Sequence, residues 1–538
     1  CEKESKNKWA VTLDGAMTVK ISYRVYAFEY TVDTSYLDTR HGVINGASVF
    51  PYVEGAEKET LLLTIIPNRE WRVITTALER VENKAEGTSF NAPSYDVLID
   101  SPIEIGNQQV YSFEVSNVPH EVSIFGPTVT ETSAFVSDLK RIVEVTWPIF
   151  GEIPYKRYVF LVDFVGGSSG GGLEHLNSTH CIAPRLRMKP VQDYRSLMSL
   201  FSHEFFHAWN IKRLRPVGLG PFDYTNETYT KSLWVAEGIT SYYDDLILRR
   251  AGLFSVPEYL DAFSININSL QSFPSSRFES AEEASFDAWV KHYRPNENTA
   301  NTQSSYYIQG AVIGWMIDME TRHATSSKKS LDDVMRKIYR ETFSRDGRGY
   351  TEEEFEATSN EVAGKSLSSE IFDTRVRGRA KVDFQKFLDY AGLKLGPKSK
   401  NPDSKGYLGV KLRTDGGRAV VVSKLFDTPA EASGLASGDE IVALDNLRMD
   451  MALISHYISH KNPGDIVRIL ISRDGYLETI EAKLGAAPLF EYRIYKSDTA
   501  TQEQQNFFKA WMLAEWSLPL DYIEYAPSPL KPKQFDYV

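Results

Sequence analysis

The residues with the clearest chemical potential lie in the stretch "SHEFFHAWN". His203 and His207 are four positions apart, so a helix would turn both imidazoles to the same side, within reach of one metal ion. Glu204 lies on the adjacent edge, where its carboxylate could take a proton from a metal-bound water without being a ligand. This spacing predicts a catalytic site with one Zn²⁺ per chain.

A catalytic zinc ion needs a third protein ligand and one open position. The segment after His207, "AWNIKRLRPVG", has no histidine, whereas Glu237 in "WVAEGITSYY" has no cationic partner nearby in the sequence. Alternatively, Glu237 only occupies the first turn of a helix, where the dipole favours it. Asp244, two helical turns further on, could orient a ligand histidine. Asp245 is the less favoured choice, and simple surface exposure is the alternative for both.

Hydrophobic periodicity indicates which elements must position these residues. Up to about residue 165, short apolar runs such as "LLLTIIP" and the alternation over residues 19–25 predict an antiparallel β domain. From about residue 190, apolar residues recur at helical spacing and predict a mainly helical domain around "SHEFFHAWN". The linker "GPKSKNPDSK" then leads to a compact module of short strands.

Composition excludes several classes of function. The 538 residues have a formal charge of −12 and no basic run, which argues against a nucleic-acid partner. The only cysteines are Cys1 and Cys181, too few for a disulfide framework. No uninterrupted apolar run reaches the roughly 18 residues that a transmembrane helix needs.

The first residues suggest a lipid anchor. Cys1 followed by the polar segment "EKESKNK" resembles a bacterial lipoprotein after removal of its signal peptide. We therefore expect a lipid on Cys1, which would be the only membrane contact, and a location in the bacterial cell envelope. The alternative is a chain boundary that falls on a cysteine by chance.

A family resemblance extends these inferences over roughly residues 10 to 490. The stretch "SHEFFHAWNIKRLRPVGLGPFDY…LWVAEGITSYY" resembles the glycyl aminopeptidase family of zinc metallopeptidases, as do "SYLDTRHGVINGASVF", "YDVLIDSPIEIG" and "GRGYTEEEFEA". This family belongs with thermolysin and the large zinc aminopeptidases, whose third ligand is a glutamate on a later helix. The resemblance therefore implies that Glu237 binds zinc. The gap from His207 to Glu237 is longer than in thermolysin, and "GLGPFDYTNETYT" resembles this family's own extra loop.

The same resemblance implies a second group that stabilises the oxyanion. The large aminopeptidases use a tyrosine in a Y-x-K-G motif, and "YYIQG" places Tyr307 there with Gln309 in place of lysine. Its phenol would face the tetrahedral oxyanion. Tyr306 is the neighbouring alternative, and both could be ordinary aromatics at the start of a helix.

A glutamate that binds the substrate's amino group is implied in the same way. "GGLEH" resembles the G-x-M-E-N strand of the large aminopeptidases, with Leu173 for methionine and His175 for asparagine. Glu174 would then pair with the amino terminus of a peptide. Gly171 and Gly172 would leave an edge strand open to the substrate backbone. The alternative is an exposed glutamate in a mobile loop.

The C-terminal module resembles a PDZ domain in "KGYLGVKL" and "DTPAEASGLASGDEIVALDN". Its carboxylate-binding loop would be Tyr407, Leu408, Gly409 and Val410, whose backbone N–H groups would receive a peptide C-terminus. Alternatively, the module packs against its own catalytic domain and binds nothing.

Together these features predict a multidomain α+β protein with an N-terminal antiparallel β domain, a thermolysin-like, mainly helical catalytic domain and a PDZ-like β module. The expected segments are a tether (1–8), the β domain (9–165), the catalytic domain (166–396), a linker (397–405), the PDZ domain (406–486) and a C-terminal extension (487–538). The expected function is a zinc aminopeptidase acting on peptides with N-terminal Gly or Ala, a preference that the resemblance implies. The alternatives are a thermolysin-like endopeptidase and a PDZ-based surface binding protein with a vestigial zinc site.

Overall fold

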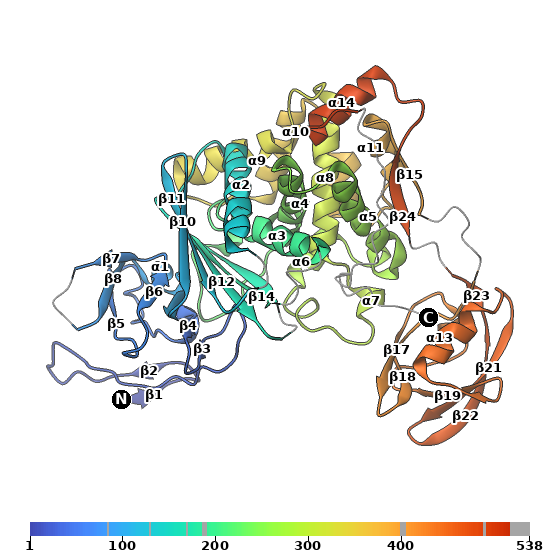
Figure 1. Ribbon diagram of the computed structural model, residues 1–538, viewed down its shortest axis with the longest axis horizontal. Helices are drawn as coiled ribbons and strands as arrows, with labels where there is room; N and C mark the ends of the chain where they lie inside the picture. The colour runs from blue at the N-terminus through green and yellow to red at the C-terminus, as the bar shows by residue number, and fades with distance from the viewer. Residues whose placement is uncertain are drawn as a thin grey trace.

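The computed structural model describes residues 1–82, 86–128, 131–167, 170–185, 191–398, 405–487 and 491–516. It confirms a multidomain α+β protein with β sheets at the N-terminus, a helical central region and a separate β module near the C-terminus (Figure 1). Within the described ranges, no helix combines the length and the apolar character that crossing a bilayer requires. Most of the predicted linker and the Pro-rich tail lie outside these ranges.

Besides an antiparallel pair of short strands, β1 (Glu2–Lys3) and β2 (Trp9–Ala10), the described N-terminal region contains two small antiparallel sheets. One has the strand order β3 (Tyr36–Leu37), β4 (Gly42–Ile44), β9 (Ile103–Gly106) and β6 (Val73–Thr76), and the other has β5 (Leu61–Ile65), β8 (Thr88–Ala92) and β7 (Glu79–Val81). The prediction of a strand over residues 19–25 is wrong, because these residues lie in no strand and Ile21 is 62% exposed. Alternation produces a strand only where a partner strand takes up its backbone hydrogen bonds.

A mixed sheet connects this region to the helices. Its strand order is β10 (Gln109–Val115), β11 (Val118–Phe125), β12 (Tyr158–Val165), β14 (Ser178–Pro184) and β13 (Gly171–His175), and β12 is parallel to both neighbours. The sheet therefore corrects the domain boundary predicted at residue 165, which falls between two of its strands. Helix α2 (Thr132–Phe150) connects β11 to β12 and was missed, because its many β-branched residues favour a strand and Pro148 disfavours a helix interior.

The helices pack around a central one. Helix α8 (Tyr306–Ala324) is buried along most of its length. It packs against α4 (Thr240–Arg250), and α4 in turn packs against α3 (Val191–Phe206). Helices α5 (Val256–Ser272) and α9 (Leu331–Tyr339) also contact α8. Helix α10 (Glu352–Ala363) begins with a capping box, which the spacing of Thr351 and Glu354 predicts: the Thr351 side chain accepts from the backbone N–H of Glu354, and the Glu354 side chain accepts from that of Thr351.

The PDZ-like module has its own core and is inserted into the helical region. Its sheet has the order β17 (Val410–Asp415), β18 (Arg418–Lys424), β19 (Glu440–Leu444), β21 (Ile466–Arg473) and β22 (Tyr476–Lys483), with helix α13 (Met451–Ser459) beside β17. Strand β15 (Leu393–Pro397), before the module, pairs with β24 (Tyr492–Lys496), after it (Figure 1). The module is thus tethered at both ends.

The described part of the predicted C-terminal extension belongs to the core of the helical region. Helix α14 (Gln502–Met512) places Phe508, Trp511 and Met512 in the same hydrophobic core as α8. The indole of Trp511 donates a hydrogen bond to the Tyr242 hydroxyl at 3.2 Å. Residues 491–516 are therefore a returning part of the helical domain, a long-range contact that local sequence patterns do not reveal.

The module also contacts the helical domain directly. The Asn301 amide donates to the carbonyl oxygen of Lys424 and accepts from the N–H of Phe426, both at 2.8 Å. Arg277 forms an exposed ion pair with Asp427 at 2.9 Å. The loop after β18 is thus held against α7 (Thr299–Thr302), the short helix that precedes α8.

Candidate metal centre

Three predicted metal ligands lie close together in the helical domain. Helix α3 carries His203, His207 follows its last turn, and Glu237 lies on the π-helix η4 (Trp234–Ile239). The Nε2 atoms of His203 and His207 are 3.2 and 3.3 Å from Glu237 Oε2. Two ligands of a tetrahedral zinc ion, each bonded at about 2.0 to 2.2 Å, lie about 3.4 Å apart. The three side chains therefore fit one zinc ion.

The outer nitrogen of each imidazole is held by a second group. His207 Nδ1 lies 2.6 Å from the backbone oxygen of Asn210, and His203 Nδ1 lies 3.2 Å from Asp244 Oδ2. A carbonyl oxygen only accepts, so Nδ1 of His207 carries the hydrogen and Nε2 keeps a free lone pair. Asp245 is turned to Ser199 instead, at 2.9 Å.

Asn210 was missed in the sequence analysis, although it stands in "HAWN". Its side-chain amide donates to the carbonyl oxygen of Val235 at 2.9 Å and to the Thr240 hydroxyl at 3.0 Å. It therefore ties the turn that carries His207 to the helix that carries Glu237. A polar residue three positions past His207 was the only signal, and its partners are too far away in the sequence to be predicted.

Two glycines allow η4 and α8 to touch backbone to backbone. A Cβ atom on Gly238 would lie 2.6 Å from the carbonyl oxygen of Tyr306, and one on Gly310 would lie 2.7 Å from Gly238 Cα. Neither residue has a positive φ angle, so the requirement is for space rather than for backbone conformation. This contact packs the element that carries Glu237 against the start of the helix that carries Tyr307.

The Glu204 carboxylate lies beneath the edge strand β13. Burial raises its pKa to about 7, against the opposing effect of His203 and His207. Its Oε2 atom is buried with no hydrogen-bond partner among the described residues. A Cβ atom on Gly172 would overlap this carboxyl group, whereas Gly171 faces open space. Gly172 therefore makes room for Glu204, a reason different from the predicted one.

The electrostatic balance of the ligands favours a cation. Burial alone would raise the pKa of Glu237, but His207 and His203 hold it well below its usual range. Burial likewise opposes protonation of His203, but Asp244 and Glu237 raise its pKa well above its usual value. The imidazoles thus sit in a strongly negative field, which a divalent ion would neutralise.

Glu174 lies at the same centre. Its carboxylate, that of Glu204 and a ring nitrogen of His207 all lie within 4.8 Å of one another. Strand β13, which carries Glu174, is at the edge of its sheet and pairs only with β14. The structure therefore places the two acidic residues and a ligand histidine together.

Asp100, from the N-terminal region, fixes the end of this edge strand. Its carboxylate lies 3.0 Å from His175 Nδ1 and accepts from Leu176 N and Lys212 Nζ, both at 2.9 Å. The carboxyl is therefore fully engaged, and the Lys212 and His175 partners hold its pKa at about 2 against the opposing effect of burial. Asp100 ends the stretch "YDVLID", and its role was not predicted.

Tyr307 faces the metal ligands, whereas Tyr306 is buried behind it. The rings of Tyr307 and His203 are 6.2 Å apart between centroids. Burial, reinforced by Glu237, raises the Tyr307 pKa well above its usual value, so the phenol keeps its proton. Tyr306 is 1% exposed and packs against Tyr307 and His292. Of the two candidates, Tyr307 is the one whose ring lies against a predicted metal ligand.

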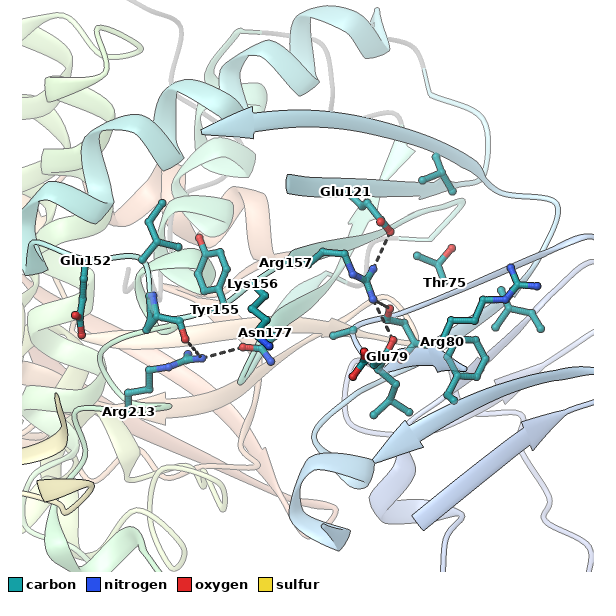
Figure 2. Close-up of a pocket in the computed structure, with 18 of the residues that line it drawn as sticks. Thr75, Glu79, Arg80, Glu121, Glu152, Tyr155, Lys156, Arg157, Asn177 and Arg213 are labelled. Atoms are coloured by element: carbon teal, nitrogen blue, oxygen red, sulfur yellow. Dashed lines mark hydrogen bonds and ion pairs between the residues drawn. The ribbon is translucent and has the colours of Figure 1, made fainter. Parts of the chain in front are cut away.

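A cavity of about 1050 Å³ lies away from this centre, between the N-terminal sheets and the central sheet (Figure 2). Arg157 crosses it, 2.9 Å from Glu121 and 2.9 Å from the carbonyl oxygen of Thr76. Arg213 donates to the carbonyl oxygen of Pro154 and to Asn177. None of the predicted site residues lines this cavity, which is a gap between domains bridged by arginines.

The predicted PDZ loop has its carbonyls engaged within the module. The Leu408 oxygen accepts from Ala430 N at 2.8 Å, and the Gly409 oxygen accepts from Leu425 N at 3.0 Å. Gly409 has φ +88°, which favours glycine. Tyr407 lies in the short strand β16 (Gly406–Tyr407), and Val410 begins the edge strand β17. The open edge of β17 beside α13 is the place where a PDZ domain takes an added strand.

Comparisons with known protein families match three parts of the chain. Residues 196–313 match M61 glycyl aminopeptidase, residues 1–107 match the peptidase M61 N-terminal domain, and residues 406–484 match the PDZ domain. A search among curated proteins found no match.

Among solved structures, the chain is similar to an aminopeptidase N family protein from Idiomarina loihiensis. The TM-score is 0.83 at 28% identity, covering 91% of this chain and 85% of that one. The HtrA-type protease AlgW with a decapeptide matches 16% of this chain and 30% of its own at 24% identity and a TM-score of 0.15. A serine endoprotease from Yersinia pestis matches 16% of this chain and 30% of its own at 20% identity and a TM-score of 0.15. Their low TM-scores indicate no similarity of overall fold.

The predicted resemblance is confirmed in both the catalytic and the N-terminal regions, and the metal ligands lie in and beside one helical core. Residues 196–313 and 1–107 thus match the catalytic and N-terminal domains of the M61 glycyl aminopeptidase family of metallopeptidases, and residues 406–484 match a PDZ domain.

Proposed function

We propose that the protein is a zinc-dependent aminopeptidase that hydrolyses the first peptide bond of peptides with an N-terminal Gly or Ala. The observation that carries this proposal is the position of Glu174 beside Glu204 and the ligand His207. A carboxylate so close to the metal centre, on an open strand edge, suits a free ammonium group. His203, His207 and Glu237 would hold the ion.

Zinc in such a site polarises the scissile carbonyl and makes a water molecule acidic near neutral pH. Glu204 is the group that moves the proton. Its Oε2 atom is without a hydrogen-bond partner in the described structure and its pKa lies near 7. A base with that pKa accepts a proton from the attacking water and returns it to the leaving amine.

Tyr307 donates a hydrogen bond to the developing oxyanion. Its phenol stays protonated at neutral pH, because burial and Glu237 raise its pKa. A preformed donor of this kind costs no reorganisation at the moment of reaction.

Glu174 sets the position of the cut. A charge-assisted hydrogen bond between its carboxylate and the substrate's ammonium fixes the peptide so that only the first peptide bond reaches the metal centre. A thermolysin-like endopeptidase would have no need of an acidic group here. The N-terminal preference for Gly or Ala rests on the family match, since no described pocket defines it.

The test compares free and blocked substrates. Gly- and Ala-p-nitroanilide should be cleaved, and their N-acetylated forms should be cleaved at least 100-fold more slowly. The variant Glu174→Gln should lose most of this discrimination while keeping its zinc. Equal cleavage of blocked substrates would favour an endopeptidase. Zinc-loaded protein with no hydrolysis of any peptide would favour a binding protein with a vestigial site.

Two expectations stay predictions. Lipid attachment at Cys1, and with it a place in the cell envelope, requires an intact-mass measurement on the native protein. Binding of a peptide C-terminus by Tyr407, Leu408, Gly409 and Val410 requires titration with C-terminal and amidated peptides.

A further inference from the structure

An aromatic strip leads from the metal centre to the surface. The His292 ring lies 5.7 Å from the Tyr307 ring and 5.2 Å from the Tyr293 ring, and Tyr293 lies 5.7 Å from Trp289, all between centroids. The two outer rings are exposed to solvent, Tyr293 by 58% and Trp289 by 48%, whereas Tyr307 is only partly exposed. We call Tyr307, His292, Tyr293 and Trp289 the aromatic strip. The strip runs from Tyr307, the proposed oxyanion donor, to rings that are exposed to solvent.

The outer end of the strip is held in place. The Trp289 indole donates to the carbonyl oxygen of Thr228 at 3.0 Å. Lys291, which lies between Trp289 and Tyr293 in the sequence, forms ion pairs with Glu279 at 2.7 Å and Asp287 at 2.9 Å. The exposed rings are therefore presented on an anchored segment.

A second exposed aromatic pair flanks the anchor of Trp289. Tyr229, next to Thr228, and Phe286 are 44% and 45% exposed, and their rings lie 5.3 Å apart. Exposed aromatic side chains gathered beside a catalytic centre mark a surface that binds a ligand. Partial burial lowers the pKa of His292, which disfavours a charge on the strip.

The position of the strip limits what can occupy it. An aminopeptidase substrate has one residue before the scissile bond, and Glu174 would hold that residue's ammonium group. If the residue is Gly or Ala, its side chain is at most a methyl group and cannot extend along four rings. Whatever contacts Tyr293 and Trp289 must then belong to the peptide after the scissile bond.

We propose that the aromatic strip is the subsite for the leaving peptide, and that Tyr293 and Trp289 select a large apolar or aromatic side chain at one of the two residues after the scissile bond. This inference rests on the proposed aminopeptidase function. Stacked and edge-on ring contacts would supply the selectivity.

The test uses three peptide amides that differ only after the first glycine: Gly-Gly-Gly-NH₂, Gly-Phe-Gly-NH₂ and Gly-Gly-Phe-NH₂. From initial rates of glycine release, the wild type should prefer one phenylalanine peptide to triglycine amide by about 10-fold or more in kcat/KM. Trp289→Ala and Tyr293→Ala should each reduce this preference at least threefold. Val290→Ala, a 60% exposed neighbour outside the strip, should leave it unchanged.

Zinc content and thermal unfolding establish that each variant is folded. If Trp289→Ala does not fold, because its bond to Thr228 is lost, Tyr293→Ala decides. Trp289→Phe should keep most of the preference, since an aromatic ring remains. No phenylalanine preference in the wild type, or an undiminished preference in folded Tyr293→Ala, would overturn the proposal.

A binding measurement separates this inference from the proposed function. In the Glu204→Gln background, calorimetry should show tighter binding of the preferred phenylalanine peptide than of triglycine amide, and Tyr293→Ala should remove the difference. If the wild type released glycine from none of the peptides, the proposed function would fail, while this titration would still decide on the strip. Equal binding of all three peptides would reject the strip.

Discussion

Buried histidines meet carboxylates around Glu237 in the helical domain, and again around Glu104 and Asp163 where the N-terminal sheet meets the central sheet. In the second place, which we call the interface cluster, the Ser123 hydroxyl donates to Glu104 at 2.6 Å and His180 Nε2 lies 2.8 Å from Asp163. All four side chains are at most 1% exposed. The two clusters have similar residue types and different chemistry.

The two clusters differ in whether ring nitrogens and carboxylate oxygens remain free to face one common point. At the metal centre, Asp244 and the Asn210 carbonyl occupy the outer ring nitrogens, so the inner nitrogens point at Glu237. In the interface cluster the groups pair with one another, and among the described residues no three of them converge on a common point. Burial and the nearby Asp163 instead raise the Glu104 pKa well above its usual value. One cluster needs a cation to balance its charge, and the other holds a proton.

The largest expected effect separates the two glutamates. Glu204→Gln should lower kcat/KM on Gly-p-nitroanilide by about 10² to 10⁴, because a proton-transfer group is lost, while zinc stays bound. Glu104→Gln should keep the activity, since glutamine mimics the protonated carboxyl. Zinc analysis and steady-state kinetics on both variants check this, and comparable activity in the two would remove the distinction.

Metal removal should affect only the first cluster. A chelator should lower the unfolding temperature of the wild type, because bound zinc at 1,000 times its Kd stabilises the fold by about 4 kcal/mol. The interface variant Glu104→Gln should show the same shift. A variant lacking a ligand, Glu237→Ala, should show almost none; a full shift there would mean that the ion binds elsewhere.

Two aspartates that contact histidines provide a matched pair. Asp244→Asn should weaken zinc binding by about 10- to 100-fold, because Asp244 orients His203. Asp163→Asn should lower the unfolding temperature by weakening the bond to His180 and leave zinc affinity unchanged. Competition with a fluorescent zinc chelator measures the affinities. Equal loss of affinity in both variants would contradict the separation of the clusters.

The smallest effect is a pH dependence of stability. The folded protein holds the Glu104 proton more tightly than the unfolded chain, whose glutamates titrate near 4.5. Stability from this group is therefore complete below that pH and falls as pH rises toward the raised pKa, by up to about 1.4 kcal/mol per pH unit. Glu104→Gln should become more stable than the wild type as pH rises from 5 to 8, measured as the difference in urea midpoints. A difference that did not change with pH would show that Glu104 is ionised in the folded state.

Short-range spacing predicted His203 and His207, because H-E-x-x-H places its side chains through the geometry of one helix, whereas Glu237 depended on the family resemblance. Glu174 and Tyr307 came from a resemblance, since they lie on other elements and spacing alone does not connect them. Asn210 and Asp100 were missed because each acts through partners brought close only by folding. Helix α2 was missed because its β-branched residues favour a strand, and the boundary at residue 165 was expected because helical periodicity begins only near residue 190.

The pairing of β15 with β24 shows a similar limit. Its two strands are separated by an entire PDZ domain, and no local pattern indicates that a chain leaving the helical core will return to it. The capping box at Thr351 was predictable because its two partners are three residues apart.

The contact between Gly238 and Gly310 determines how narrowly the metal centre tolerates substitution. A Cβ atom at Gly238 would lie 2.6 Å from a backbone oxygen, whereas non-bonded atoms need about 3.5 Å, so the helices would have to separate by about 1 Å. Metal–ligand distances hold to within about 0.2 Å. An alanine at either position would therefore displace Glu237 by several times the distance that zinc coordination tolerates. These two glycines constrain the metal centre as strictly as a ligand does.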